Sequence, residues 1–169
     1  MVKIKGFGNC PEYGHWISVC GEIDPSKYFG FIYLVHCKET GQFYIGKKQF
    51  NSITKKKVTG KVRKKTVVKE SDWKTYATSS EYIKRDLEEF GQDSFEFFIV
   101  QTYHTRGGLS HGEANLQHKF DVMTKRIDTD NRLFYNANIA GVKFVTKETY
   151  IEAEQRIQKL VKLYSKKEK

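Results

Sequence analysis

Cysteine, proline and long apolar runs are scarce in this chain of 169 residues, and each scarcity excludes a class of protein. Two prolines argue against a fibrous or proline-rich chain, while 38% apolar residues suffice for one packed core. Three cysteines without a CxxC pair indicate neither a disulfide framework nor a zinc finger. No stretch approaches the roughly 20 apolar residues of a membrane span, and the first residues do not follow the order of a secretory signal. We therefore expect a compact cytoplasmic domain with no membrane partner.

Acidic residues are absent from residues 47–69, although the whole chain contains 20 of them. The same stretch holds nine lysines and Arg63, so it carries the net charge of +10 while the remainder of the chain balances. Its valines alternate as in a short hairpin around Gly60, rather than with the period of an interfacial helix. We predict a basic β-type arm or loop over residues 47–70 that binds a polyanion, with nucleic acid as the leading candidate. The candidate contacts are Gly46, Lys47, Lys48, Lys55, Lys56, Lys57, Lys61, Arg63, Lys64 and Lys65.

The segment before this stretch, FIYLVHCKETGQFYIG from Phe31 to Gly46, has the pattern of a β-hairpin. Aromatic and β-branched residues fill two runs, and a polar turn with Gly41 joins them. We expect the second strand to end at Gly46, where the backbone could turn sharply or approach a phosphate closely. Each run carries a tyrosine, Tyr33 and Tyr44.

Helical and strand patterns alternate further along the chain. Ser79 and Ser80 are expected to cap a helix that Gly91 ends, and residues 95–100 read as a strand broken by Arg106, Gly107 and Gly108. A second helix is expected from Ser110, with Glu113 at the edge of the face that meets the sheet. A glutamate near a helix N-terminus is also explained by the helix dipole alone.

Over residues 31–141 this arrangement resembles the GIY-YIG nucleases. The resemblance implies an α+β fold, a small three-stranded antiparallel sheet flanked by helices, here with a basic insertion and a C-terminal helix. It matches Tyr33 and Tyr44 to the motif tyrosines, Gly46 to the motif glycine, Glu113 to the metal-binding glutamate and Asn136 to the late asparagine. Residues 79–91 also resemble the middle section of phage intron-encoded homing endonucleases.

Two departures from the family pattern concern the first motif and the catalytic cation. Phe31 stands where the motif expects glycine, with Gly30 one place earlier, and the usual helical arginine is replaced by the lysine-rich insertion. Arg63 is our first candidate for the cation, because its planar fork can bind a phosphate with two hydrogen bonds. Lys48 and Arg85 are the alternatives. The three histidines at positions 104, 111 and 118 do not occupy the family position and receive no role.

The resemblance implies a metal-dependent DNA endonuclease of the stand-alone phage or mobile-element type, acting in the host cytoplasm if a phage encodes it. Glu113 would hold Mg²⁺, or Mn²⁺ in its place, and Tyr33, in preference to Tyr44, would act as base if nearby lysines stabilise its phenolate. Asn136 would fix a tyrosine or the glutamate by hydrogen bonding, or serve only as a turn residue. The alternatives are a restriction or repair nicking enzyme and a non-catalytic nucleic-acid-binding protein on the same scaffold.

The expected domain organisation has three parts. Residues 1–29 form an N-terminal extension packed on the core, residues 30–145 form the catalytic domain, and residues 146–169 form an amphipathic basic helix. Thr146 is expected to cap this helix, whose apolar stripe docks on the domain or, as an alternative, makes a homodimer seam.

Overall fold

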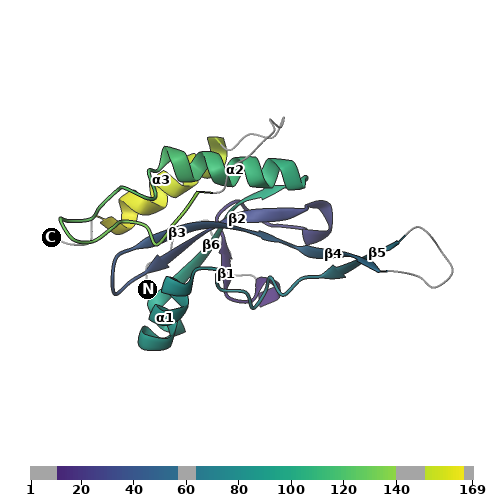
Figure 1. The fold of residues 1–169 in the computed structure, drawn as a ribbon, viewed down its shortest axis with the longest axis horizontal. Coiled ribbons are helices and arrows are strands. Elements are labelled where there is room, and N and C mark those ends of the chain that lie inside the picture. The colour runs from purple at the N-terminus through teal and green to yellow at the C-terminus, as the bar shows by residue number, and fades with distance from the viewer. Residues whose placement is uncertain (1–10, 57–63, 140–150, 166–169) are drawn as a thin grey trace.

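The computed structural model describes residues 11–56, 64–139 and 151–165, and a four-stranded mixed sheet lies at its centre (Figure 1). The strand order is β1-β6-β2-β3, in which β2 is antiparallel to both of its neighbours and β1 is parallel to β6. Residue bounds are Trp16–Ser18 for β1, Gly30–Cys37 for β2, Phe43–Gln49 for β3 and Phe95–Tyr103 for β6.

The expected α+β class is confirmed, but the prediction of three antiparallel strands is wrong. The fourth strand comes from the segment that we expected to be an extension, and it pairs with β6 in parallel. Backbone groups on the outer edge of β6 need partners, and β1 with its flanking residue Val19 provides them, as in the 3.0 Å bond from Val19 N to Ile99 O. Three residues are too few for a period-two pattern, which is why the sequence did not reveal this strand.

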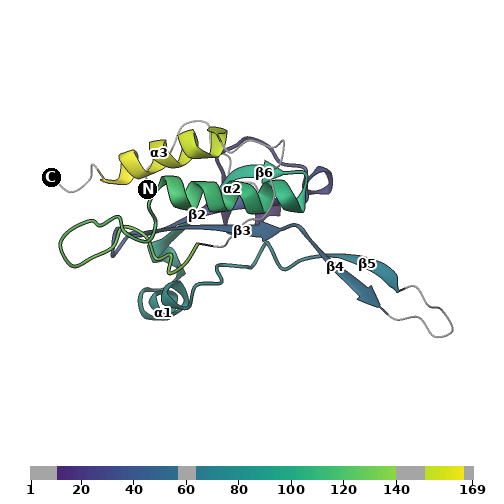
Figure 2. The ribbon, with the colours of Figure 1, turned by 45° about the horizontal axis from the view of Figure 1, so that its top comes forward.

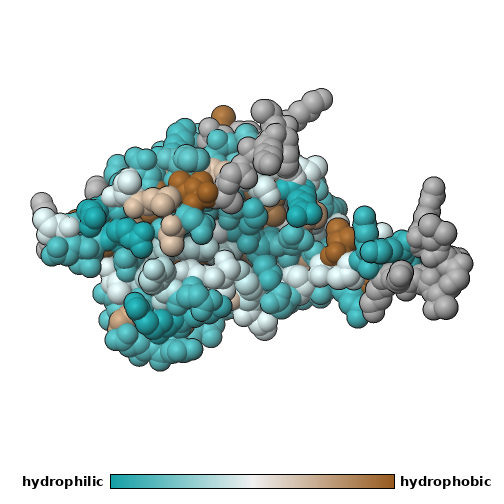
Figure 3. Space-filling model, viewed as in Figure 1, coloured by the Kyte–Doolittle hydropathy of each residue, from teal (hydrophilic) through white to brown (hydrophobic). Residues whose placement is uncertain are grey.

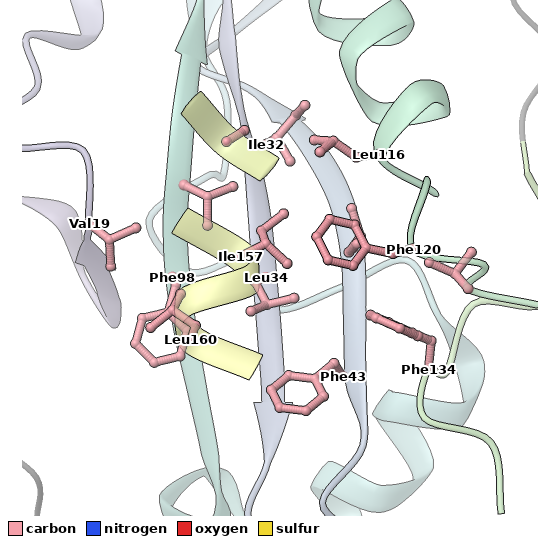
Figure 4. Packing of buried hydrophobic residues seen from close by; sticks show 14 of the residues in the cluster. Val19, Ile32, Leu34, Phe43, Phe98, Leu116, Phe120, Phe134, Ile157 and Leu160 are labelled. Carbon is pink, nitrogen blue, oxygen red and sulfur yellow. The ribbon is translucent and has the colours of Figure 1, made fainter. Parts of the chain in front are cut away.

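Strand β2 is apolar except for His36 because both faces of the sheet are covered, and all eight of its residues are buried. Ile32 and Leu34 point toward the cluster beneath α2 and α3, where Leu116 and Ile157 pack against them (Figure 4). The alternate residues of β2 point to the opposite face and join a second cluster around Trp16, Phe50 and Trp73. Tyr33 lies in this second cluster.

Within the described ranges, three α-helices flank the sheet, α2 and α3 on one side and α1 on the other (Figure 2). Their bounds are Glu81–Phe90 for α1, Arg106–Lys119 for α2 and Ile151–Ser165 for α3. Short 3₁₀ turns occur at Pro11–Tyr13, Pro25–Lys27 and Gln92–Ser94.

The helix ends agree with the sequence at α1 and differ at α2. Ser80 and Gly91 flank α1 at its two ends, as predicted, although the Ser80 side chain makes no capping hydrogen bond. Helix α2 begins at Arg106 instead of Ser110, because the Oγ1 atom of Thr105 accepts a 3.0 Å hydrogen bond from the backbone N–H of Gly108. The glycines at 107 and 108 therefore form the first turn of the helix and do not break the chain.

The C-terminal helix α3 docks on the sheet, as predicted. Ala153, Ile157 and Leu160 are buried in the cluster shared with α2, and Val161 and Tyr164 pack against it. This stripe is therefore used within the chain, and a homodimer would need a different surface. The predicted cap, Thr146, lies outside the described residues.

The basic insertion forms a two-stranded antiparallel ribbon that projects from the body of the protein (Figures 1 and 2). Strands β4 (Asn51–Lys56) and β5 (Lys65–Glu70) make up the ribbon, which confirms the predicted hairpin character, while its tip lies outside the described residues. Most of the surface seen in Figure 3 is hydrophilic. Among the described helices, none has the length and apolar character to cross a bilayer.

Candidate active site

A cavity of about 440 Å³ opens beside the edge strand β3. Strand β3 contributes Tyr44 and Lys47, α2 contributes Glu113 and Gln117, and the segment after β6 and α2 contributes Asn136. The remaining lining residues are Ser79, Ser80, Glu81, Tyr82, Ala137 and Asn138. Three of the five residues matched to the family motifs therefore line one space.

Gly46 lies inside β3 and not at its end, so the predicted strand end is wrong. Gly46 is the cross-strand partner of Tyr33 and follows Tyr44 by two residues, so both rings lie on its face of the sheet. A Cβ atom at Gly46 would lie 2.5 Å from Tyr33 Cζ and 2.7 Å from Tyr44 Cε1. The position needs glycine because the two motif rings occupy the space of a side chain.

The two tyrosines differ in their access to the cavity. Tyr33 is 1% exposed, and burial raises the pKa of its hydroxyl well above the ordinary value. Tyr44 lines the cavity, and its hydroxyl lies 3.3 Å from Ser79 Oγ. Burial also raises the pKa of Tyr44. The expected lowering of a tyrosine pKa by neighbouring lysines is therefore absent in the protein without nucleic acid.

Glu113 forms an ion pair with Lys47, and both side chains line the cavity. The Lys47 Nζ atom lies 2.7 Å from Glu113 Oε2 and donates a 3.2 Å hydrogen bond to Ser110 Oγ. The Glu113 side chain is only 10% exposed. Burial raises the pKa of Glu113, and the charge of Lys47 acts in the opposite direction. A carboxylate and a cation are thus held together in a largely desolvated place.

The two lysines that follow Gly46 point to opposite faces of the sheet, because side chains alternate along a strand. Lys47 points toward α2, whereas the Lys48 Nζ atom lies 2.6 Å from Asp72 Oδ1 and 3.6 Å from the centre of the Tyr76 ring. Lys48, proposed from the sequence as a cation for the reaction, does not line the cavity with Glu113.

The cation beside Glu113 is Lys47, a residue that the sequence reasoning placed among the DNA contacts and did not consider as the cation for the reaction. Arg63, the first candidate, lies outside the described residues, and Arg85 is an exposed residue of α1 that binds Asp86. The signal was available in the alternation of β3, because Lys47 follows the buried Ile45 by two residues and therefore shares the face that α2 covers.

Asn136 extends the hydrogen-bond pattern of the sheet at its edge. Its Oδ1 atom accepts from Ile45 N at 3.1 Å, and its Nδ2 atom donates to Ile45 O at 2.9 Å. Gln117 Nε2 donates to the same carbonyl at 3.0 Å. The expected contact of Asn136 with a tyrosine or with Glu113 is therefore wrong, because both of these bonds go to the backbone of the strand that carries the site.

Tyr44 and Glu113 approach the cavity from opposite faces of the sheet. They can meet because β3 is the edge strand and the cavity extends around its edge. The segment that includes Phe134 pairs with β3 only near Phe43, and Asn136 ends this pairing at Ile45. The cavity lies just beyond this point.

The other predicted residues lie away from the cavity. His104, His111 and His118 do not line it. Lys55, Lys64 and Lys65 are exposed on or beside the ribbon, Lys56 belongs to β4, and Lys57 and Lys61 lie outside the described residues.

Paired tyrosines packed over a motif glycine, with a helical glutamate at the sheet edge, define a nuclease of the GIY-YIG class. Comparison with protein families agrees: the model described as "Putative endonuclease segE, GIY-YIG domain" matches residues 16–139, which is more than half of the chain. The chain therefore belongs to the GIY-YIG endonucleases of the phage SegE type, and it is a phosphodiester hydrolase. Searches of curated proteins and of solved structures gave no significant match.

Proposed function

We propose that this endonuclease cuts DNA with the help of a divalent cation, at the cavity beside β3. The observation that carries the proposal is the convergence of Tyr44, Lys47 and Glu113 on that cavity. A second cavity of about 290 Å³ shares Lys47 and reaches Asn51 and Ser52, the first residues of β4. A phosphate backbone bound along the basic ribbon would therefore lead directly to the cavity.

The residues present fit a divalent cation. Mg²⁺ prefers oxygen ligands and uses few from the protein, and the cavity offers the carboxylate of Glu113. Gln117, which also lines the cavity, has a buried amide oxygen without a hydrogen-bond partner. No group of three or more histidine, cysteine, aspartate or glutamate residues occurs within the described ranges, so we propose Glu113 as the charged ligand. A bound Mg²⁺ would supply Lewis-acid stabilisation of negative charge on the phosphate and on the departing oxygen.

Side chains of the protein supply the remaining catalytic roles, which are phosphate binding and orientation of the attacking water. Lys47 lies beside Glu113, so its ammonium group can bind a nonbridging oxygen of the scissile phosphate and offset the charge that develops there. Tyr44 is the motif tyrosine with access to the cavity, so we assign it to orient the attacking water, in place of the preference for Tyr33 drawn from the sequence. Because burial raises the pKa of Tyr44, its hydroxyl is neutral when it orients the water.

Two other motif residues support this arrangement. The Tyr33 ring packs 6.0 Å from the Tyr44 ring, measured between centroids, and holds its position over Gly46. Asn136 fixes the strand that carries Tyr44 and Lys47 through its two bonds to Ile45. Both act by positioning and not by contact with the phosphate.

A cleavage assay with supercoiled plasmid tests the proposal. We expect nicked or linear DNA with Mg²⁺ or Mn²⁺, none with EDTA, and at least about 10²-fold slower cleavage by Glu113→Gln with DNA binding retained. Glu96→Gln, which changes a carboxylate that pairs with His36 and does not line the cavity, is the matched control. Equal cleavage by Glu113→Gln would exclude the metal assignment, and binding without cleavage by the unchanged protein would favour the non-catalytic alternative.

The sites of cleavage distinguish the biological roles that we expect. Digestion of one long DNA should give a unique set of ends if the enzyme acts in homing or restriction. Scattered ends would indicate general degradation or recognition of DNA structure. The same digestion with a matched RNA tests the choice of DNA as substrate, because preferential RNA cleavage would contradict it.

A further inference from the structure

Gln117 is a buried amide in the wall of the cavity, one helical turn after Glu113. Its exposed fraction is 4%, and it belongs to the face of α2 that meets the sheet. Residues four apart on a helix lie on the same face, so the two side chains are neighbours. The amide nitrogen is satisfied by the 3.0 Å hydrogen bond that it donates to Ile45 O.

The amide oxygen of Gln117 is buried and has no hydrogen-bond partner. Its orientation is determined by the nitrogen, because exchanging the two atoms would put two acceptor oxygens against each other at Ile45. A buried carbonyl oxygen without a partner costs free energy, so folded proteins rarely keep one without a use. A leucine at this position would fill the same space without that cost.

We propose that Gln117 Oε1 is a second protein ligand of the divalent cation, beside the carboxylate of Glu113. Amide and carboxylate oxygens are both ligands that Mg²⁺ accepts. A neutral ligand suits this buried place because a second carboxylate beside the largely buried Glu113 would destabilise the protein without metal, even though it would attract the cation more strongly. The inference rests on the proposed metal-dependent reaction and assigns a residue that the family motif does not include.

Titration of Mn²⁺ into the full chain without DNA, followed by electron paramagnetic resonance of the free ion, tests the inference. The Mn²⁺ binding that is lost in Glu113→Gln defines the site. Gln117→Leu should weaken that binding by at least about tenfold, as expected for removal of a ligand. The matched control is Asn115→Leu, an amide on the same helix that bonds His111 and does not line the cavity, and it should bind Mn²⁺ as the unchanged protein does.

The variant Gln117→Glu distinguishes between a role of residue 117 as a metal ligand and a role that is only the support of β3. A carboxylate at 117 keeps a ligand oxygen and adds charge, so Mn²⁺ should bind more tightly, by about tenfold, even though the hydrogen bond to Ile45 O is lost. A residue that served only to support β3 would give weaker or unchanged binding. Thermal unfolding of each variant verifies that the compared proteins are folded.

A measurement on the unchanged protein covers the case in which a variant does not fold. In a ¹³C NMR spectrum, the chemical shift of the Gln117 side-chain carbonyl carbon should change on addition of Mg²⁺. The change should reach half-saturation at the same Mg²⁺ concentration as that of the Glu113 carboxyl carbon. A shift of Glu113 alone would overturn the inference and mean that a water molecule satisfies the amide oxygen.

The outcomes keep this inference separate from the proposed function. If Glu113→Gln binds Mn²⁺ as well as the unchanged protein does, the metal assignment itself fails. If Glu113→Gln loses the site while Gln117→Leu keeps it within twofold, only the role of Gln117 is refuted.

Discussion

Replacement of Gly46 by alanine tests the reason for the motif glycine. The backbone of Gly46 is not in the left-handed region, so alanine is permitted there by conformation. By backbone entropy alone, this change inside a strand should stabilise the protein by about 0.5–1 kcal/mol. The packing of the two tyrosines reverses this expectation, so that alanine at position 46 should lower the free energy of unfolding.

The size of the steric clash follows from the contacts of the added methyl group. It would lie 2.5 Å from Tyr33 Cζ, whereas an ordinary contact begins at 3.4 Å, so the ring must retreat by about 0.9 Å. Tyr33 is 1% exposed and packs between Trp16 and Tyr76, at centroid distances of 5.1 and 6.2 Å, so it has little room to move. Overpacking of this kind costs about 1–3 kcal/mol, more than the entropic gain.

Gly46→Ala should therefore lower the free energy of unfolding by about 1–2 kcal/mol and slow cleavage by about 10²-fold, because Tyr44 is displaced at the cavity wall. Urea denaturation and the plasmid assay measure the two effects. In a double-mutant cycle with Tyr33→Val, which removes the ring that the methyl group would meet, the two changes should cost about 1 kcal/mol less together than the sum of their separate costs. Stabilisation by Gly46→Ala, or strict additivity in the cycle, would refute the explanation.

Three further perturbations test the cavity and the ribbon. Lys47→Met leaves the buried carboxylate of Glu113 unpaired and raises its pKa further, so the variant should lose little stability near pH 4 and about 1–3 kcal/mol at pH 8. Urea titrations measure this loss, and Glu113→Gln in the same chain should remove its pH dependence. An equal loss at both pH values would contradict the pairing of Lys47 with Glu113. Tyr44→Phe should lower kcat by about 10²-fold or more while Tm changes little, and a kcat within threefold would exclude Tyr44 as the group that orients water. Removal of three exposed lysines on or beside the ribbon should reduce the slope of log K for DNA against log salt by about 3, whereas an unchanged slope would mean that the ribbon does not contact phosphate. These lysines are Lys55, Lys64 and Lys65.

The pH dependence of Glu113 has a definite sign in the unchanged protein as well. Burial raises the pKa of its carboxyl in the folded state above the ordinary value. The folded protein therefore keeps its full stability below the unfolded pKa and loses part of it as the pH rises through the folded pKa. Lys47 limits this loss, because its charge acts to lower the pKa of Glu113.

The central hairpin, helix α1 and the docking of α3 were predicted because each has a local signal. Strand β2 is a run of apolar residues, Ser80 and Gly91 mark the ends of α1, and a stripe at helical spacing marks α3. Strand β1 was missed because three residues hold no period, and the start of α2 was missed because glycines usually interrupt helices.

The amino-acid sequence by itself determined the kind of parts that this protein contains: a tyrosine on each strand of a hairpin, a glutamate on a helix and a lysine-rich insertion. Only the tertiary structure decided how these parts combine. The position of β3 at the edge of the sheet lets residues from opposite faces reach one cavity, and the alternation along β3 directs Lys47 to Glu113 and Lys48 away from it. The physical reason is that strand order and packing bring together residues far apart in the sequence, and no local pattern records those distances.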